Sequence, residues 1–145
     1  MKPTVRNVAR PLLLDTCAAL WLMDGAPLSA KTTDAIDLAS DRNEPVYVSP
    51  FMAWEIGKLA ECERLPATVT PQVWFKSLTS LSLIRLADLT PEILIQSSCL
   101  PGKAHKDPAD RILIATAREL AMTIVTRDRL ILDYAARGYV AAIAC

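Results

Sequence analysis

The chain has 145 residues, which is the size of one ordinary domain and enough to bury a hydrophobic core. Hydrophobic residues make up 52% of it, a composition that excludes an intrinsically disordered chain. Its 16 basic and 16 acidic residues cancel, so no overall field attracts nucleic acid. Polyanion binding would depend on local basic clusters, namely Lys103, Lys106 and Arg111, and Arg127 with Arg129.

The first ten residues are basic but lack the apolar segment of a secretion signal. No apolar run in the chain approaches the ~18 to 20 residues that cross a bilayer. We therefore expect a cytoplasmic protein without a membrane partner, built as a flexible leader at residues 1–10 and a single domain at residues 11–145.

The cysteines and the single histidine exclude most zinc sites. Cys17, Cys62, Cys99 and Cys145 are far apart in the sequence and form no C-x-x-C pair. The simplest interpretation is that they are free, mostly buried thiols in a reducing compartment.

Five short apolar or β-rich runs predict strands at residues 11–14, 46–48, 83–86, 123–125 and 140–143. Stretches with helical spacing separate them. Four helices are predicted to begin with a capping residue followed by proline, and Gly138 is predicted to end the last helix. The capping pairs are Ser49-Pro50, Thr70-Pro71, Thr90-Pro91 and Asp107-Pro108. Strands that alternate with helices indicate an α/β domain with a mostly parallel sheet.

Acidic residues follow two of the predicted strands, at the carboxyl ends where sites form in such sheets. Asp15 follows the first strand and Asp128 the fourth, but aspartate is also a favoured N-cap, so each is open to both interpretations. Asp107 is best interpreted as a cap. Asp110 falls at the third position of the same helix, where an acid also interacts well with the helix dipole.

Glu55, in "SPFMAWEIGKL", is harder to explain as a cap. The helix is predicted to begin near Pro50, which puts Glu55 beyond its first turn and on the shoulder of the apolar stripe of Met52, Ile56 and Leu59. A carboxylate there is costly unless it is paired or binds a cation. The alternative is a salt bridge to a lysine or arginine.

Asp15, Glu55, Asp110 and Asp128 are therefore predicted to converge at one edge of the sheet. Carboxylates ~6 Å apart repel by roughly 3 kcal/mol per pair at an effective dielectric near 20, so the group either takes up protons or holds a cation. Oxygen ligands without His or Cys indicate Mg²⁺, or Mn²⁺, rather than zinc. Such an ion activates water and stabilises charge on a phosphate, which is the chemistry of phosphodiester hydrolysis.

The segments "LLLDTCAALW", "VSPFMAWEIGKL", "HKDPADRILIATA" and "TIVTRDR" resemble the successive motifs of PIN-domain ribonucleases, and most of all the VapC-type toxins of toxin–antitoxin pairs. The resemblance covers residues 11–145. It implies a three-layer fold whose five-stranded, mostly parallel sheet is flanked by helices. It also implies Mg²⁺-dependent endoribonuclease activity on RNA, homodimerisation, and inhibition by a cognate antitoxin.

The same resemblance places the family's metal-binding acids at Asp15, Glu55, Asp110 and Asp128, and its conserved Thr or Ser at Thr126. Relatives often carry His at the position of Cys17 and a larger apolar residue at that of Ala109. Further residues expected to touch substrate or to support the acids are Thr16, Thr126, Asp107, Arg111 and His105.

Several other side chains have more than one interpretation. His105 is expected to face solvent or contact phosphate rather than serve a nucleophilic triad. Arg111 is either a phosphate contact or a surface or ion-paired arginine. Trp21, Trp54 and Trp74 are expected to belong to the core or to an interface rather than to stack on bases.

Two other functions compete with the nuclease. Asp15 in "LLLDT" would be an aspartyl nucleophile in a phosphoryl transferase, although no lysine is clearly placed to assist it. Alternatively, the chain is a non-catalytic α/β interaction module whose acids are helix caps and ion pairs.

Overall fold

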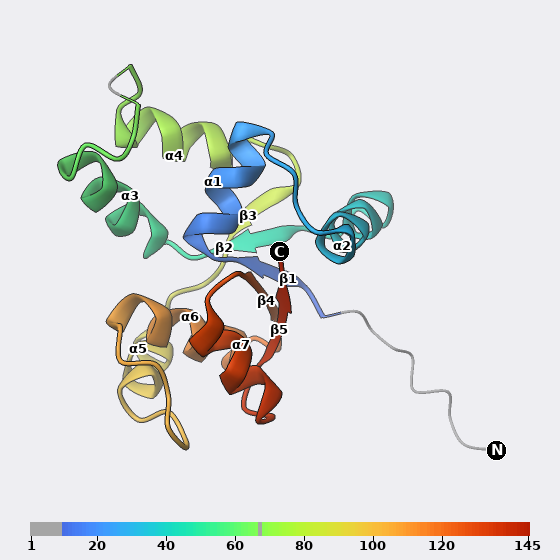
Figure 1. Ribbon diagram of the computed structural model, residues 1–145, viewed down its shortest axis with the longest axis vertical. Coiled ribbons are helices and arrows are strands. Elements are labelled where there is room, and N and C mark those ends of the chain that lie inside the picture. The colour runs from blue at the N-terminus through green and yellow to red at the C-terminus, as the bar shows by residue number, and fades with distance from the viewer. Residues whose placement is uncertain (1–9, 67) are drawn as a thin grey trace.

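The computed structural model describes residues 10–66 and 68–145. Within them, five strands and seven helices follow one another along the chain (Figure 1). They are β1 (Leu12–Leu14), α1 (Thr16–Asp24), α2 (Ala30–Asp41), β2 (Val46–Val48), α3 (Met52–Glu61), α4 (Pro71–Thr79), β3 (Ile84–Leu86), α5 (Pro91–Ser98), α6 (Pro108–Glu119), β4 (Thr123–Thr126), α7 (Arg129–Ala136) and β5 (Ala141–Ala144). The predicted leader lies outside the described residues except for Arg10.

The strands form one sheet in the order β3-β2-β1-β4-β5, and every neighbouring pair is parallel. Leu13 of β1 is in register with Tyr47 of β2 on one side and with Ile124 of β4 on the other. The α/β class and the five-stranded parallel sheet are thus confirmed. Because the strands are parallel, their carboxyl ends meet at one edge, where β1, β2 and β4 continue into Asp15, Ser49 and Arg127.

The alternation of side chains along β1 divides the core between the two faces of the sheet. Leu12 and Leu14 pack with buried residues of α1, α3 and α4, whereas Leu13 packs with buried residues of α6 and α7. Figure 1 shows the same three layers, with α1, α3 and α4 on one side of the sheet and α5, α6 and α7 on the other.

Three of the four predicted proline-led helix starts are confirmed, and the fourth is wrong. Thr70, Thr90 and Asp107 cap α4, α5 and α6 as expected. The helix after β2 begins only at Met52, because Ser49 instead accepts the Phe51 N–H in a tight turn and the next amides bond three residues back.

Glu55 therefore lies in the first turn of α3, contrary to the prediction that it lies beyond it. The end of α7 matches the expectation, since Gly138 adopts φ +87°, a left-handed conformation that glycine enters without steric cost.

The expectation of mostly buried thiols is wrong: Cys17, Cys62 and Cys99 are exposed, and only Cys145 is buried. All four are free. Among the described helices, none has the length and apolarity needed to cross a membrane.

Candidate active site

A pocket of about 320 Å³ opens at the carboxyl ends of the central strands. All four acids selected from the sequence line it: Asp15 from the end of β1, Glu55 from α3, Asp110 from α6 and Asp128 from the start of α7. The pocket also has an apolar wall, to which Leu14, Phe51, Met52 and Leu113 contribute. Acids that lie up to 113 positions apart in the chain, from Asp15 to Asp128, thus meet at one place because the sheet is parallel.

Asp15 and Asp128 are helix caps and pocket residues at once. Asp15 Oδ1 accepts the Ala18 N–H at 2.7 Å, and Asp128 Oδ1 accepts the N–H groups of Leu130 and Ile131 at 2.8 and 3.1 Å. The Oδ2 atoms of both side chains make different contacts, with Thr126 and His105 respectively. Capping therefore fixes the orientation of each carboxylate and leaves its second oxygen available to the site.

Two threonine hydroxyls hold the carboxylates of Asp15 and Glu55. Thr126 Oγ1 donates to Asp15 Oδ2 at 2.5 Å and accepts the Asp128 N–H at 3.0 Å, so this buried side chain links two acids. Thr16 Oγ1 donates to Glu55 Oε1 at 2.8 Å. The partner of Glu55 is thus a hydroxyl, and the salt bridge that the sequence left open is not its explanation.

His105 holds the other two acids. Its Nε2 lies 3.0 Å from Asp110 Oδ2 and 3.1 Å from Asp128 Oδ2, and its side chain is only 11% exposed. Its Nδ1 accepts the Asp107 N–H at 3.0 Å, which leaves Nε2 as the nitrogen that donates toward the two carboxylates. The expectation that His105 faces solvent is therefore wrong, because Asp110 and Asp128 surround its Nε2, while the expectation that it contacts phosphate stays a prediction.

The loop that carries His105 is fixed by side chains from the helices around it. Tyr134 Oη donates to the Pro101 carbonyl at 2.5 Å, and Arg137 donates to that of Lys103 at 2.7 Å. Arg111 donates to the carbonyls of Ser97 and His105 at 2.7 and 3.0 Å. The sequence-based expectations for Arg111 did not include this contact, in which its guanidinium joins a carbonyl of α5 to a carbonyl of the loop.

Asp107 begins α6 as predicted. Its Oδ1 accepts the N–H groups of Ala109 and Asp110 at 2.9 and 3.2 Å, and its side chain is exposed beside the pocket rather than among its lining residues. Its main contribution to the pocket is structural, because it starts the helix from which Asp110 projects and its own N–H orients His105.

Burial and mutual repulsion make the pocket a costly place for negative charge. Burial raises the pKa of Asp15, against the lowering effect of the Thr126 and Ala18 hydrogen bonds. Burial also raises the pKa of Glu55, and the charges of Asp107 and Asp15 add to this effect. The pKa of Asp110 rises to about 7, chiefly by burial and further by the neighbouring carboxylates, although His105 opposes the rise.

These residues fit a divalent cation. Ligand atoms of His105, Asp110 and Asp128 all lie within 4.8 Å of one another, and Asp15 and Glu55 line the same pocket outside this tight group. Burial, and then neighbouring carboxylates, raise the pKa values of Asp15, Glu55 and Asp110, so these groups gain from a positive charge among them. A donor set of four carboxylates is also the kind that Mg²⁺ and Mn²⁺ prefer.

Sequence reasoning did not assign Arg127 and Phe51 to the pocket that they line. The Arg127 guanidinium lies 3.2 Å from the centre of the Trp21 ring, and its Nε donates to the Cys145 carbonyl at 2.8 Å. The available signal for Arg127 was its position between Thr126 and Asp128, directly after β4. The available signal for Phe51 was its position in the turn between β2 and α3, near the carboxyl end of a strand that neighbours β1.

The fold and site are those of an α/β domain with an acidic pocket at the carboxyl edge of its parallel sheet, and residues 12–137 match the PIN domain family. The chain therefore belongs to the PIN-domain family, as the motifs predicted. A similar curated protein is ribonuclease VapC22 of Mycobacterium tuberculosis, 31% identical over 119 residues that cover 81% of this chain and 87% of that protein.

Solved structures share the fold at lower sequence identity. VapBC2 from Rickettsia felis, bound to a DNA fragment from its promoter, has a TM-score of 0.65 at 11% identity over 92% of this chain and 97% of that one. A toxin–antitoxin complex from Klebsiella pneumoniae has a TM-score of 0.56 at 18% identity, covering 91% of this chain and 95% of that one.

Proposed function

We propose that this chain is a Mg²⁺-dependent endoribonuclease that acts as the toxin of a toxin–antitoxin pair. The observation that carries the proposal is the convergence of Asp15, Glu55, Asp110 and Asp128 on one pocket of a PIN domain. Its similarity to ribonuclease VapC22 supports RNA as the substrate. Mn²⁺ is an alternative ion for the same oxygen ligands.

In this proposal Asp15, Glu55, Asp110 and Asp128 hold the ion. When bound, the ion supplies activation of a water and neutralisation of charge on the scissile phosphate. Thr126 and Thr16 keep the Asp15 and Glu55 carboxylates oriented toward the pocket. His105 does the same for Asp110 and Asp128, and Arg127 contributes positive charge to the wall where a phosphate would enter.

The proposed partners follow from the same relationships. A cognate antitoxin is supported by the solved relatives, which include VapBC2 and a toxin–antitoxin complex. A homodimer, a cytoplasmic location and a single domain from residue 11 to residue 145 remain part of the proposal.

The test is cleavage of a labelled single-stranded RNA with and without Mg²⁺. We expect wild-type protein to cut only with the ion, and Asp15→Asn and Asp110→Asn to lose at least about a hundredfold in rate, because each removes a charged ligand while asparagine keeps the side-chain shape. Asp34→Asn, on the exposed face of α2, is the matched control and should cut at the wild-type rate.

If Asp15→Asn and Asp110→Asn both cut at the wild-type rate, the acids are not the catalytic site. The non-catalytic interaction module would then be favoured, because that alternative assigns the acids to capping and asparagine caps as well as aspartate. A covalent phosphoaspartate on Asp15, detected by mass spectrometry, would instead favour phosphoryl transfer.

A further inference from the structure

Trp54 is exposed beside the acidic pocket. It precedes Glu55 on α3, and 56% of its surface is accessible, whereas Trp74 is buried at 7% and Trp21 is half-buried against Arg127. The sequence predicted that each tryptophan belongs to the core or to an interface. Trp54 is too exposed to be a core residue. An exposed indole costs solvation free energy, so its position calls for an explanation.

We propose that Trp54 is a stacking platform for one base of a single-stranded RNA whose backbone passes the acidic pocket. This inference rests on the proposed ribonuclease function and names how that site holds its substrate. An aromatic face accepts any base by stacking, so such a platform orients a strand without requiring a particular sequence.

Phe51 connects the platform to the pocket. The Phe51 and Trp54 rings stack with centroids 5.4 Å apart and planes inclined by 27°, and Phe51 itself lines the pocket together with Glu55. The two rings form an aromatic surface that begins inside the pocket and ends in solvent. Because Phe51 braces the indole, the platform loses little side-chain freedom when a base stacks on it.

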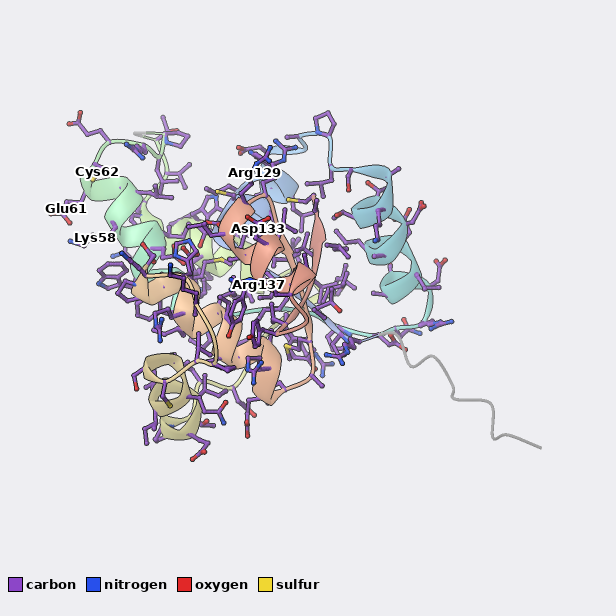
Figure 2. The ribbon with its side chains drawn as sticks, turned by 60° about the horizontal axis from the view of Figure 1, so that its bottom comes forward. Lys58, Glu61, Cys62, Arg129, Asp133 and Arg137 are labelled. Carbon is purple, nitrogen blue, oxygen red and sulfur yellow. The ribbon has the colours of Figure 1, made fainter. Side chains whose placement is uncertain are left out.

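Lys58 adds the positive charge that the neighbouring phosphates require. It lies one turn after Trp54, with its Nζ 5.5 Å from the centre of the Trp54 ring. Figure 2 shows Lys58 on α3 at the outer edge of the molecule. Lys58 Nζ lies 3.3 Å from Glu61 Oε2, and both side chains are exposed. Exposed ion pairs of this kind contribute little free energy, so the ammonium is available to a phosphate.

The surroundings of Trp54 favour a base over a protein as its occupant. The exposed neighbours on the same helix are Ala53, Lys58 and Glu61, so the indole stands among small and charged side chains. A protein interface of ordinary size requires a broader apolar patch, whereas a single base requires one aromatic face and a nearby cation.

Binding measured separately from cleavage tests the proposal. The probe is a short, mixed-sequence, fluorescently labelled single-stranded RNA, titrated in Mg²⁺ with protein carrying Asp15→Asn so that cutting does not interfere. Trp54→Ala in this background should weaken binding by about five- to a hundredfold, the range for loss of one stacked base. Trp54→Phe keeps an aromatic face and should recover most of the affinity.

Two controls separate stacking from general surface effects. Ile95→Ala removes a 63%-exposed apolar side chain on α5 and should leave RNA binding unchanged. A second RNA series with single abasic positions should identify one position at which Trp54→Ala has no further effect. RNA should also quench tryptophan fluorescence in the Asp15→Asn protein but not in the Trp54→Phe variant.

If Trp54→Ala in the Asp15→Asn background binds RNA as tightly as Asp15→Asn alone, the stacking proposal is wrong. A change in oligomeric state on Trp54→Ala, measured by sedimentation at the assay concentration, would also overturn it, because Trp54 would then be a contact between copies of the chain. Failure of the ribonuclease proposal is a different result: Asp15→Asn alone would cut RNA like the wild type.

Discussion

The two sides of the acidic pocket hold their carboxylates by different means. Asp15 and Glu55 each accept an O–H from a threonine, whereas Asp110 and Asp128 share the single Nε2–H of His105. The threonine side is built from residues at the ends of β1 and β4 and on the helices α1 and α3. The histidine side depends on a loop held in place by Tyr134, Arg137 and Arg111.

The threonine side supports its carboxylates rigidly, whereas the histidine side can adjust. Thr126 is fully buried as the last residue of β4 and bonds two acids at once, so a change in its geometry would also disturb the end of that strand. His105 Nε2 occupies the Oδ2 atoms of Asp110 and Asp128, where a cation would also bind. We therefore expect the threonine side to fix the site and the histidine side to yield when an ion binds.

The largest effect should come from the threonine side. Thr126→Val keeps the shape of the side chain but removes the donor to Asp15 and the acceptor for the Asp128 N–H. We expect Mn²⁺ affinity to fall by about ten- to a hundredfold, as for other supporting contacts of metal ligands. Calorimetric titration measures this, and Thr126→Ser, which keeps the hydroxyl, should bind within a few-fold of wild type. If Thr126→Val and the wild type bind Mn²⁺ with equal affinity, the threonine side does not fix the site and the proposed difference between the two sides is contradicted.

The free energy of unfolding of the metal-free protein should depend on pH, because the site holds buried carboxylates close together. The pKa of Asp110 is about 7 in the folded protein against an ordinary 3.8, so the folded state holds more protons than the unfolded state in this window. The stability contributed by protonated Asp110 is complete below the ordinary value and is lost as pH rises through about 7. The free energy of unfolding in chelator should therefore fall by up to about 1.4 kcal/mol per pH unit.

Urea unfolding from about pH 4 to about pH 8 checks this expectation. Asp110→Asn should flatten most of the slope, and the exposed control Asp34→Asn should leave it unchanged. Asp15 and Glu55, whose pKa values are also raised, supply the slope that remains. An Asp110→Asn protein with the full wild-type slope would contradict the assignment.

The smallest effect on ion affinity should come from His105→Ala. The imidazole supports Asp110 and Asp128, but its Nε2–H also competes with an ion for the same oxygens, so the two consequences of removing it oppose each other. We expect Mn²⁺ affinity to change by less than about tenfold, at the low end for a supporting contact. A larger loss of Mn²⁺ affinity would indicate that His105 itself binds the ion. In that case nitrogen NMR of the ring should show that the proton has moved from Nε2 to Nδ1.

The parts of the fold and site that the sequence predicted are those with local causes. Asp15 directly follows β1, Asp128 lies two residues after β4, and Thr70, Thr90 and Asp107 begin helices through contacts with residues two or three positions away. The start of α3 was missed because Ser49 and Pro50 form a turn rather than the first turn of the helix, a choice between two local hydrogen-bond patterns that the sequence permits equally.

The contact between His105 and Asp128, and the contacts that hold the loop in place, had no local signal. Asp128 is 23 residues from His105, and Tyr134 reaches the same loop across 33 residues. The sequence also could not predict that Trp54, Cys17, Cys62 and Cys99 are exposed. A helical pattern predicts which residues share a face, but not which faces another element covers.

Calorimetric titration of Mn²⁺ into the metal-free protein near pH 8 tests the central claim most directly, because Asp110 is then ionised and paramagnetic manganese can be counted independently by resonance spectroscopy. The account predicts saturable binding that chelator reverses and that Asp15→Asn and Asp110→Asn each weaken strongly. Absence of binding to the wild-type protein, or equal binding by both variants, would contradict the conclusion that these acids share a divalent ion.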